Sequence, residues 1–394
     1  MDPYIDPDSL DPGHPLTARK LANLAVADAA HGERSVQFDA LPSKITFQTT
    51  DVCNLSCGHC QIPARLKQAS MPPRFLDDLS EKLLPDLIEL HPTNLGEPFA
   101  WPHFKRLCAL LDEFGVVLDL TTNGTLLTPS RVEWIAPIAR DVKISFDGAT
   151  AATFERHRRG ANFTAVCESV SGLVRRLDAV RVRRPIVALQ MTLMRDNVHE
   201  LPELVRLANS LRVHRVKAYH LFSFGSEYDG QSVLRDSEEY ETEILPRTLE
   251  LGQALGIDLQ LAEPSGGRAA ELTEQACHLP WHESWIDVDG SVVLCHSHGG
   301  EIAGHIDRFR EAWMGPLYQR VREGFARRRP IGACDGCGMN LLKSEEHQRV
   351  PYDPATFLSS GTDEGAVAWS GRMRPFNLGG RRPGFGSSPR GEEA

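Results

Sequence analysis

The chain has 394 residues, of which 41% are hydrophobic and 24% are charged, and its net charge is −10. This composition is ordinary for a globular protein, and the length is sufficient for two domains. The negative charge disfavours nucleic acid or an anionic membrane surface as the main partner. The sequence has no apolar run long enough to span a bilayer, and its first residues lack the features of a secretory signal. We therefore expect a cytoplasmic protein without a membrane or nucleic-acid partner.

The predicted elements alternate between strands and helices. An irregular arm over residues 1–15 precedes a helix over 17–29 that Thr17 could cap. Apolar runs then predict six strands, over 45–49, 87–90, 116–120, 142–146, 186–193 and 216–221. Amphipathic stretches between them predict helices over 76–87, 103–114, 129–138, 163–177 and 201–211. This alternation indicates an α/β fold with a parallel sheet, either doubly wound or a barrel.

The rest of the chain has a different pattern. A long helix is predicted over 238–255, ending at Gly256, and Asp289-Gly290 predicts a hairpin turn. A further helix is predicted over 310–323, and the chain becomes rich in Gly, Pro and Arg beyond about residue 350. We expect five units: an arm and helix, a main domain, a connecting helix, a small α+β domain and a tail. Their predicted bounds are 1–40, 41–235, 236–256, 257–345 and 346–394.

The nine cysteines are unevenly distributed. In a reducing cytoplasm they should be thiols or metal ligands. Seven of them form two groups, which are Cys53, Cys57 and Cys60, and then Cys277, Cys295, Cys334 and Cys337. Cys108 and Cys167 lie in apolar helical stretches, which favours a buried structural role. The alternative is that one of them donates a hydrogen atom to a substrate radical.

The first cysteine group has the spacing C-x3-C-x2-C, immediately after the first predicted strand. Three thiols are an odd number, and such short loops fit disulfide geometry poorly. A zinc site would need a nearby fourth ligand, for which His59 is available. Three thiolates would instead hold an iron–sulfur cluster with one iron left open for a small molecule.

Four further motifs follow successive predicted strands, where parallel β/α folds place their chemistry. They are Asn94-Leu95-Gly96-Glu97-Pro98, Thr121-Thr122-Asn123-Gly124, Ser145-Phe146-Asp147-Gly148 and Arg158-Arg159-Gly160. Together with the cysteine loop, this series resembles the radical S-adenosylmethionine (radical SAM) superfamily. The resemblance implies a 4Fe–4S cluster on Cys53, Cys57 and Cys60, with SAM on the open iron. It also implies SAM contacts by His59, Gly96, Glu97, Asn123, Ser145, Asp147 and Arg158, with His59 against adenine and Arg158 on the carboxylate.

The second cysteine group begins at Cys277-His278-Leu279-Pro280-Trp281 and ends in a C-x2-C pair. Paired cysteines of this kind also occur in structural zinc sites. The pattern resembles the twitch/SPASM extension of radical SAM enzymes, which implies one auxiliary 4Fe–4S cluster on Cys277, Cys295, Cys334 and Cys337. Four nearby histidines could replace one cysteine, namely His278, His282, His296 and His298.

The resemblance implies a partial (β/α)6 TIM-like barrel with a small C-terminal iron–sulfur domain. It implies reductive cleavage of SAM, with an electron from an external donor such as flavodoxin or ferredoxin, followed by hydrogen abstraction from a substrate. No leader-binding winged-helix module is apparent before residue 40, which favours a small molecule. We expect dehydrogenation or epimerisation of a sugar or aminocyclitol in secondary metabolism, such as antibiotic biosynthesis.

Two alternatives stay open, namely peptide modification and a non-enzymatic zinc-binding protein. Polar residues near the ends of the fifth and sixth predicted strands could face the substrate, and these are Gln190, Thr192, Tyr219, His220 and Ser223.

Overall fold

The computed structural model describes residues 7–60, 69–179, 185–221, 228–233, 238–261, 277–295 and 301–334. Its centre is one ten-stranded sheet with the order β10-β9-β8-β1-β2-β3-β4-β5-β6-β7. The strands are β1 (Lys44–Phe47), β2 (Glu89–His91), β3 (Val117–Thr122), β4 (Ala139–Ser145), β5 (Ile186–Leu193), β6 (Arg215–His220), β7 (Asp258–Gln260), β8 (Glu283–Ile286), β9 (Ser291–Val293) and β10 (Ile302–His305).

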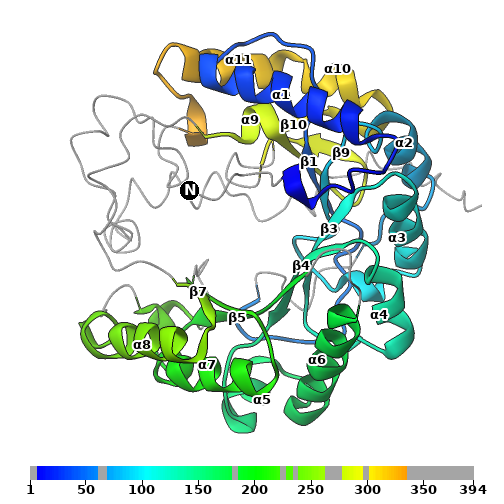
Figure 1. Ribbon diagram of the computed structural model, residues 1–394. Helices are drawn as coiled ribbons and strands as arrows, with labels where there is room; N and C mark the ends of the chain where they lie inside the picture. The colour runs from blue at the N-terminus through cyan, green and yellow to red at the C-terminus, as the bar shows by residue number, and fades with distance from the viewer. Residues whose placement is uncertain are drawn as a thin grey trace, which may run out of the picture.

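The run from β8 to β7 is parallel throughout, whereas β9 and β10 pair antiparallel. The sheet curves into an open crescent with the helices along its outer side (Figure 1). This confirms the predicted partial barrel.

The helices are α1 (Thr17–Glu33), α2 (Phe75–Lys82), α3 (Phe104–Glu113), α4 (Pro129–Ile135), α5 (Ala151–His157), α6 (Phe163–Asp178), α7 (Leu201–Ser210), α8 (Leu245–Leu255), α9 (Leu279–His282), α10 (Phe309–Trp313) and α11 (Pro316–Ala326). Short 3-10 turns occupy Pro7–Ser9, Pro98–Ala100, Val198–Glu200, Asp229–Gln231, Ile306–Arg308 and Gly332–Cys334. Side-chain oxygens of Thr128, Thr150 and Asn162 cap α4, α5 and α6, as their residue types favour.

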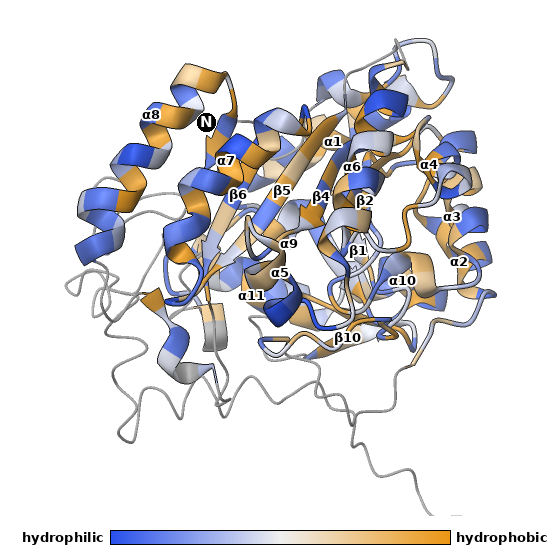
Figure 2. Cartoon of the chain, turned by 90° about the horizontal axis from the view of Figure 1, so that it is seen from below, coloured by the Kyte–Doolittle hydropathy of each residue, from blue (hydrophilic) through white to orange (hydrophobic). Residues whose placement is uncertain are grey.

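The core lies between the convex side of the sheet and the helices. On β6, Val216 and Ala218 are buried against the helices, while of the alternate residues Lys217 is partly buried and Tyr219 is exposed. Figure 2 shows hydrophobic residues concentrated on β4 and β5. The helices that cover these strands have hydrophilic outer surfaces. The alternation of strand side chains therefore gives the crescent an apolar convex face and a polar concave face.

The concave face carries a network of paired charged side chains. Asp119 on β3 contacts Lys44, His91 and Lys143 from three neighbouring strands. Burial alone would raise the pKa of Asp119, but these cationic neighbours hold it well below its ordinary value. Glu89 pairs in turn with Lys44 and Arg140. Charged side chains of β1 to β4 therefore pair with one another on this face of the sheet.

Several element bounds differ from the predictions for local reasons. The helix predicted over 310–323 is two helices, separated at Met314 and Gly315. The helix predicted over 238–255 begins as a π-helical turn, Tyr240–Ile244, before α8, whose first turn contains Pro246. Proline has no N–H to donate, so it disturbs the hydrogen-bond ladder there. The predicted end at Gly256 and the hairpin at Asp289-Gly290 are both confirmed.

The largest difference concerns the C-terminal region. The sequence predicted six parallel strands, but β7 and β8 extend the parallel array at its two sides. Lys44 to Phe47 of β1 pair with Glu283 to Ile286 of β8, so the C-terminal hairpin continues the barrel sheet. The segment that follows the N-terminal helix is hydrogen-bonded to the same C-terminal region. The indole N–H groups of Trp281 and Trp313 donate to the carbonyls of Ser35 and Ala40 in that segment.

No helix among the described residues is long and apolar enough to cross a membrane.

Candidate cofactor site

The cysteine loop leaves β1 at the carboxyl side of the sheet, and Gln48 fixes its start. The Gln48 side-chain amide donates to the carboxylate of Asp51 and to the carbonyl of Leu95, each at 2.8 Å. Its carbonyl oxygen accepts from the backbone N–H of Asn94 at 2.6 Å. One buried amide thus joins the cysteine loop to the segment after β2. Gln48 was not among the site residues predicted from the sequence. Its polar side chain at the end of an apolar strand was a signal that could have identified it.

Three further segments hold the loop from the other side. The N–H of Ser56 donates to the carbonyl of Arg159 at 3.0 Å, and the side chain of Asn54 donates to Thr125 at 2.8 Å. Tyr228, after β6, lies against the loop, because a Cβ built on Gly58 would be 2.3 Å from its hydroxyl oxygen. The ends of β3, β4 and β6 therefore all contribute to the position of the thiols.

The three thiols differ in exposure. Cys53 and Cys57 are partly buried, Cys60 is exposed, and none of the eight cysteines among the described residues forms a disulfide. Burial raises the pKa of the Cys53 and Cys57 thiols, while the positive charge of Arg158 opposes this effect at Cys57. N–H groups approach both sulfurs, from Asn123 at 3.8 Å to Cys53 and from Arg158 at 3.9 Å to Cys57.

The donor set fits an iron–sulfur cluster. Among the described residues, no three His, Cys, Asp or Glu side chains converge closely enough to hold a single metal ion. The thiols of Cys53, Cys57 and Cys60 are close enough to influence one another's pKa. Three thiolates can hold a 4Fe–4S cluster, and N–H donors near sulfur are typical of such sites.

Gly96 and Glu97 follow β2 beside the loop. Gly96 has φ of +81°, and a Cβ there would be 2.5 Å from the carbonyl oxygen of Thr50, so only glycine fits without strain. The Glu97 carboxylate is buried and accepts from Thr122 Oγ1 at 2.7 Å, from Asn123 N at 2.8 Å and from Phe99 N at 3.3 Å. Burial raises the pKa of Glu97 to about 7, although these hydrogen bonds oppose the rise. Glu97 thus joins the ends of β2 and β3.

Asp147 and Arg158 form an ion pair after β4, with 2.5 Å between Oδ2 and Nε. His59 Nε2 lies 3.2 Å from the same carboxylate oxygen, and Thr192 N donates to Oδ1 at 2.8 Å. Burial alone would raise the pKa of Asp147, but Arg158 and His59 hold it below its ordinary value. The His59 ring contacts Tyr228 edge to face, with 5.9 Å between ring centroids. The predicted residues His59, Asp147 and Arg158 therefore lie together beside Cys57.

A row of hydrogen-bonding side chains continues along the concave face. The register pairs Ser145 with Gln190 and Thr192 with Tyr219. Tyr219 is 44% exposed and Gln190 and Thr192 are partly buried, whereas His220 contacts the buried ring of Tyr240. Ser223 lies outside the described residues. We call Ser145, Gln190, Thr192 and Tyr219 the polar row.

Three of the auxiliary cysteines lie in the C-terminal region. Cys277 and Cys334 are partly buried against the main core, and Cys295 is buried just after β9. Cys337, His296 and His298 lie outside the described residues. His282 is buried in α9, and burial lowers the pKa of His278 to about 3 and that of His282 to about 4.

Cys108 and Cys167 occupy helices on the convex side. Cys108 on α3 is buried in the core, and burial raises its thiol pKa to about 12. Cys167 on α6 is partly buried, with a pKa raised to about 11 by burial. Both positions support the structural interpretation, because the cysteine loop and the polar row lie at the ends and on the concave face of the strands.

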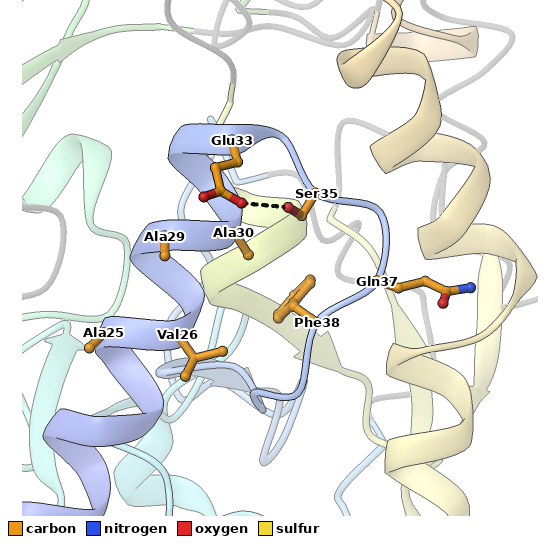
Figure 3. A pocket seen from close by; sticks show the side chains of 8 residues that line it. All are labelled: Ala25, Val26, Ala29, Ala30, Glu33, Ser35, Gln37 and Phe38. Atoms are coloured by element: carbon orange, nitrogen blue, oxygen red, sulfur yellow. Dashed lines mark hydrogen bonds between the residues drawn. The ribbon is translucent and has the colours of Figure 1, made fainter.

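A separate hollow of about 400 Å³ lies between α1 and the segment that follows it. Figure 3 shows apolar side chains of α1, including Val26, facing Phe38 across it. None of the predicted site residues lines this hollow, so it is no part of the candidate cofactor site.

The fold and the site define a class of iron–sulfur enzyme, with a three-thiol cluster loop at the carboxyl ends of an open β/α barrel. Residues 47–208 match the radical SAM superfamily, and residues 277–338 match the SPASM iron–sulfur cluster-binding domain. The chain belongs to the radical SAM superfamily, and its cofactors are SAM, the 4Fe–4S cluster that binds it and an auxiliary iron–sulfur centre.

Among relatives, the AdoMet-dependent heme synthase of Methanosarcina barkeri is 28% identical over 188 residues, covering 46% of this chain and 50% of that protein. The chain thus spans half the length of that relative. The PqqA peptide cyclase of Gluconobacter oxydans is 25% identical over 365 residues, covering 85% of this chain and 96% of that protein. Streptococcus suis SuiB bound to precursor peptide SuiA has a similar fold, with a TM-score of 0.59, 14% identity and coverage of 87% and 78%.

Proposed function

We propose that this protein is a radical SAM enzyme that oxidatively modifies a peptide. The observation that carries the proposal is the match to the PqqA peptide cyclase, because it covers 85% of this chain and 96% of that protein. The likeness to the heme synthase covers only half of each protein and supports the shared chemistry more than a shared substrate. When bound, the cofactors supply one electron and the 5′-deoxyadenosyl radical that removes a substrate hydrogen atom.

The residues of this chain would position the reactants. Hydrogen bonds of Gln48 and Glu97 hold the cluster loop against the segments after β2 and β3. The methionine part of SAM is proposed to bind beside these segments. The polar row offers amide and hydroxyl groups that suit peptide carbonyl and N–H groups. Oxidation of the substrate removes one hydrogen atom and then one further electron and one proton. The auxiliary cysteines, beginning at Cys277, would hold the acceptor of that electron.

The polar row also supports a second candidate function. Hydroxyl and amide side chains recognise a sugar or aminocyclitol equally well, so dehydrogenation or epimerisation of such a molecule stays the competing proposal. An external flavodoxin or ferredoxin would supply the first electron in either case.

The radical chemistry is tested on anaerobically reconstituted protein. About eight irons per chain are expected for two 4Fe–4S clusters. With dithionite and SAM, 5′-deoxyadenosine should form, and Cys57→Ala should abolish it while Cys334→Ala retains it. Full SAM cleavage by Cys57→Ala would contradict the assignment of the first group. A colourless protein with about two zinc ions would instead support the zinc-binding alternative.

The substrate class is tested by mass spectrometry with precursor peptides encoded beside the gene, and with aminocyclitols in parallel. A peptide product that has lost two hydrogens, formed in step with 5′-deoxyadenosine, would support the proposal. Oxidation or epimerisation of the aminocyclitol, with the peptides unchanged, would overturn it in favour of the second candidate.

A further inference from the structure

One lysine stands among the hydrogen-bonding side chains of the concave face. Lys217 on β6 is paired in register with Gln190 of the polar row on one side and with Gln260 of β7 on the other. Side chains paired in this way emerge on the same face of a sheet, as does that of Tyr219, two positions further along β6. The Lys217 side chain is 13% exposed, and Tyr219 is 44% exposed. The polar row therefore has one cation beside its amide and hydroxyl groups.

Lys217 is the cation of this face with the most distant anionic partner. Each of the other cations is in closer contact with a carboxylate, and these pairs are Lys44–Glu89, Arg140–Glu89, Lys143–Asp119 and Arg215–Asp258. Lys217 has one ion pair among the described residues, with Nζ 3.9 Å from Asp141 Oδ2. Arg215 lies 3.8 Å from the same oxygen and therefore shares it. A distance of 3.9 Å is too long for a hydrogen bond, so the ammonium keeps donors for a further acceptor.

The ion pairs of the concave face link more cations than carboxylates. The cations are Lys44, Arg140, Lys143, Arg215 and Lys217, and the carboxylates are Glu89, Asp119, Asp141 and Asp258. His91 adds no charge at neutral pH, because burial lowers its pKa. Burial also lowers the pKa of Lys217, although Asp141 opposes this effect. An anionic ligand would offset the solvation that the buried ammonium has lost.

We infer that Lys217 binds a carboxylate of the substrate, either an acidic side chain or the C-terminal carboxylate of the peptide. The inference rests on the proposed peptide oxidation and names a group by which the peptide is held. An ammonium and a carboxylate form a charge-assisted hydrogen bond, which is stronger than a neutral one. The Gln190 amide and the Tyr219 hydroxyl are further donors on the same face. The ammonium repels the protonated amines of an aminocyclitol, so Lys217 favours the peptide over the second candidate.

The first test is steady-state kinetics of the reconstituted full-length enzyme with a precursor peptide that the wild type oxidises. Lys217→Met removes the charge and keeps most of the side-chain length, so KM should rise at least about tenfold with kcat within about twofold. Lys217→Arg should restore much of the lost affinity. Lys105→Met is the matched control, because Lys105 is exposed on α3 beside the ring of Trp134. Iron content and 5′-deoxyadenosine formed without peptide verify that each variant holds its cofactors. An unchanged KM in Lys217→Met would overturn the inference.

Peptide variants identify the carboxylate. Each Asp or Glu of the peptide is replaced in turn by its amide, and the C-terminus is amidated in a separate peptide. One of these changes should raise the KM of the wild type by the same factor as Lys217→Met and have no further effect on that variant. Effects that multiply in the combination, or neutral peptides that all keep the wild-type KM, would overturn the inference.

Failure of the proposed function has a different signature. A wild-type enzyme that cleaves SAM but oxidises none of the peptides contradicts peptide oxidation, and the carboxylate site is then decided by binding alone. N-acetylglutamate and N-acetylglutamine are compared by ligand-observed nuclear magnetic resonance. A preference of the wild type for the acid, lost in Lys217→Met, would support the site. Equal binding of the acid by the two proteins would overturn it.

Discussion

The backbone N–H of Asn123 donates a hydrogen bond of 2.8 Å to the buried carboxylate of Glu97. The Thr122 hydroxyl donates to the other carboxylate oxygen, so a single side chain after β2 fixes the end of β3. This relation gives Glu97 a structural task in addition to its proposed contact with SAM. It also fixes the residue whose amide approaches Cys53.

Glu97→Ala should therefore destabilise the folded chain by about 2–4 kcal/mol, because it leaves buried donors without their acceptor. Urea denaturation of the reconstituted protein measures the effect. Glu133→Ala is the control, since Glu133 forms an exposed pair with Arg176 and its loss should change stability little. Equal effects of the two variants would show that the Glu97 contacts contribute little.

Gly96→Ala should be strongly destabilising, by about 2 kcal/mol or more, and should lower SAM binding. Its φ of +81° is unfavourable for alanine, and the new Cβ would meet the backbone of Thr50 at 2.5 Å. Gly172→Ala is the matched control. Gly172 lies within α6 with space around it, so alanine there should be neutral or stabilising by up to about 1 kcal/mol. A Gly96→Ala protein with wild-type stability and SAM affinity would contradict this prediction.

The pH dependence of stability should carry a contribution from Glu283 on β8. Burial raises the pKa of Glu283 to about 8, although hydrogen bonding from Trp285 opposes the rise. Between its ordinary pKa of about 4.5 and about 8, the folded state keeps a proton that the unfolded state has lost. Raising the pH through this window therefore favours unfolding.

Glu283→Gln should remove this contribution. The free energy of unfolding of the variant, relative to the wild type, should rise by a few kcal/mol, at roughly 1.4 kcal/mol per pKa unit, between about pH 5 and pH 8. Partly buried His278 and buried His282 act in the opposite direction below about pH 6.5, but they are present in both proteins and cancel in the comparison. A difference between the proteins that does not change with pH would argue against the raised pKa.

Cys108→Ala and Cys167→Ala should each retain SAM cleavage and product formation within about twofold, a change of under 1 kcal/mol in the barrier. Their side chains pack on the convex side, so neither is placed to return a hydrogen atom to a substrate radical. Product analysis with and without deuterated solvent measures any hydrogen return. If one variant alone forms 5′-deoxyadenosine but no product, that cysteine is the donor and an epimerase mechanism gains support.

The sequence by itself determined the order of the chemistry along the chain. The spacing of Cys53, Cys57 and Cys60 and the glycine-containing turns after successive strands are local features, and local spacing restricts what a loop can bind. The alternation of apolar segments likewise specified a parallel sheet with helices, because period-2 and period-3.6 patterns are properties of short windows. The barrel and SAM as the ligand of the open iron were implied by the resemblance to the radical SAM superfamily that those local signals carry.

Only the tertiary structure decided which groups meet. The pairing of Thr46 with the Glu283 carboxylate joins residues 237 positions apart, and no local pattern encodes a parallel contact of that range. The partner of Arg158 was equally undetermined, because a charged side chain can reach several groups and its choice depends on what the fold buries beside it. The structure places Arg158 between Asp147 and Cys57.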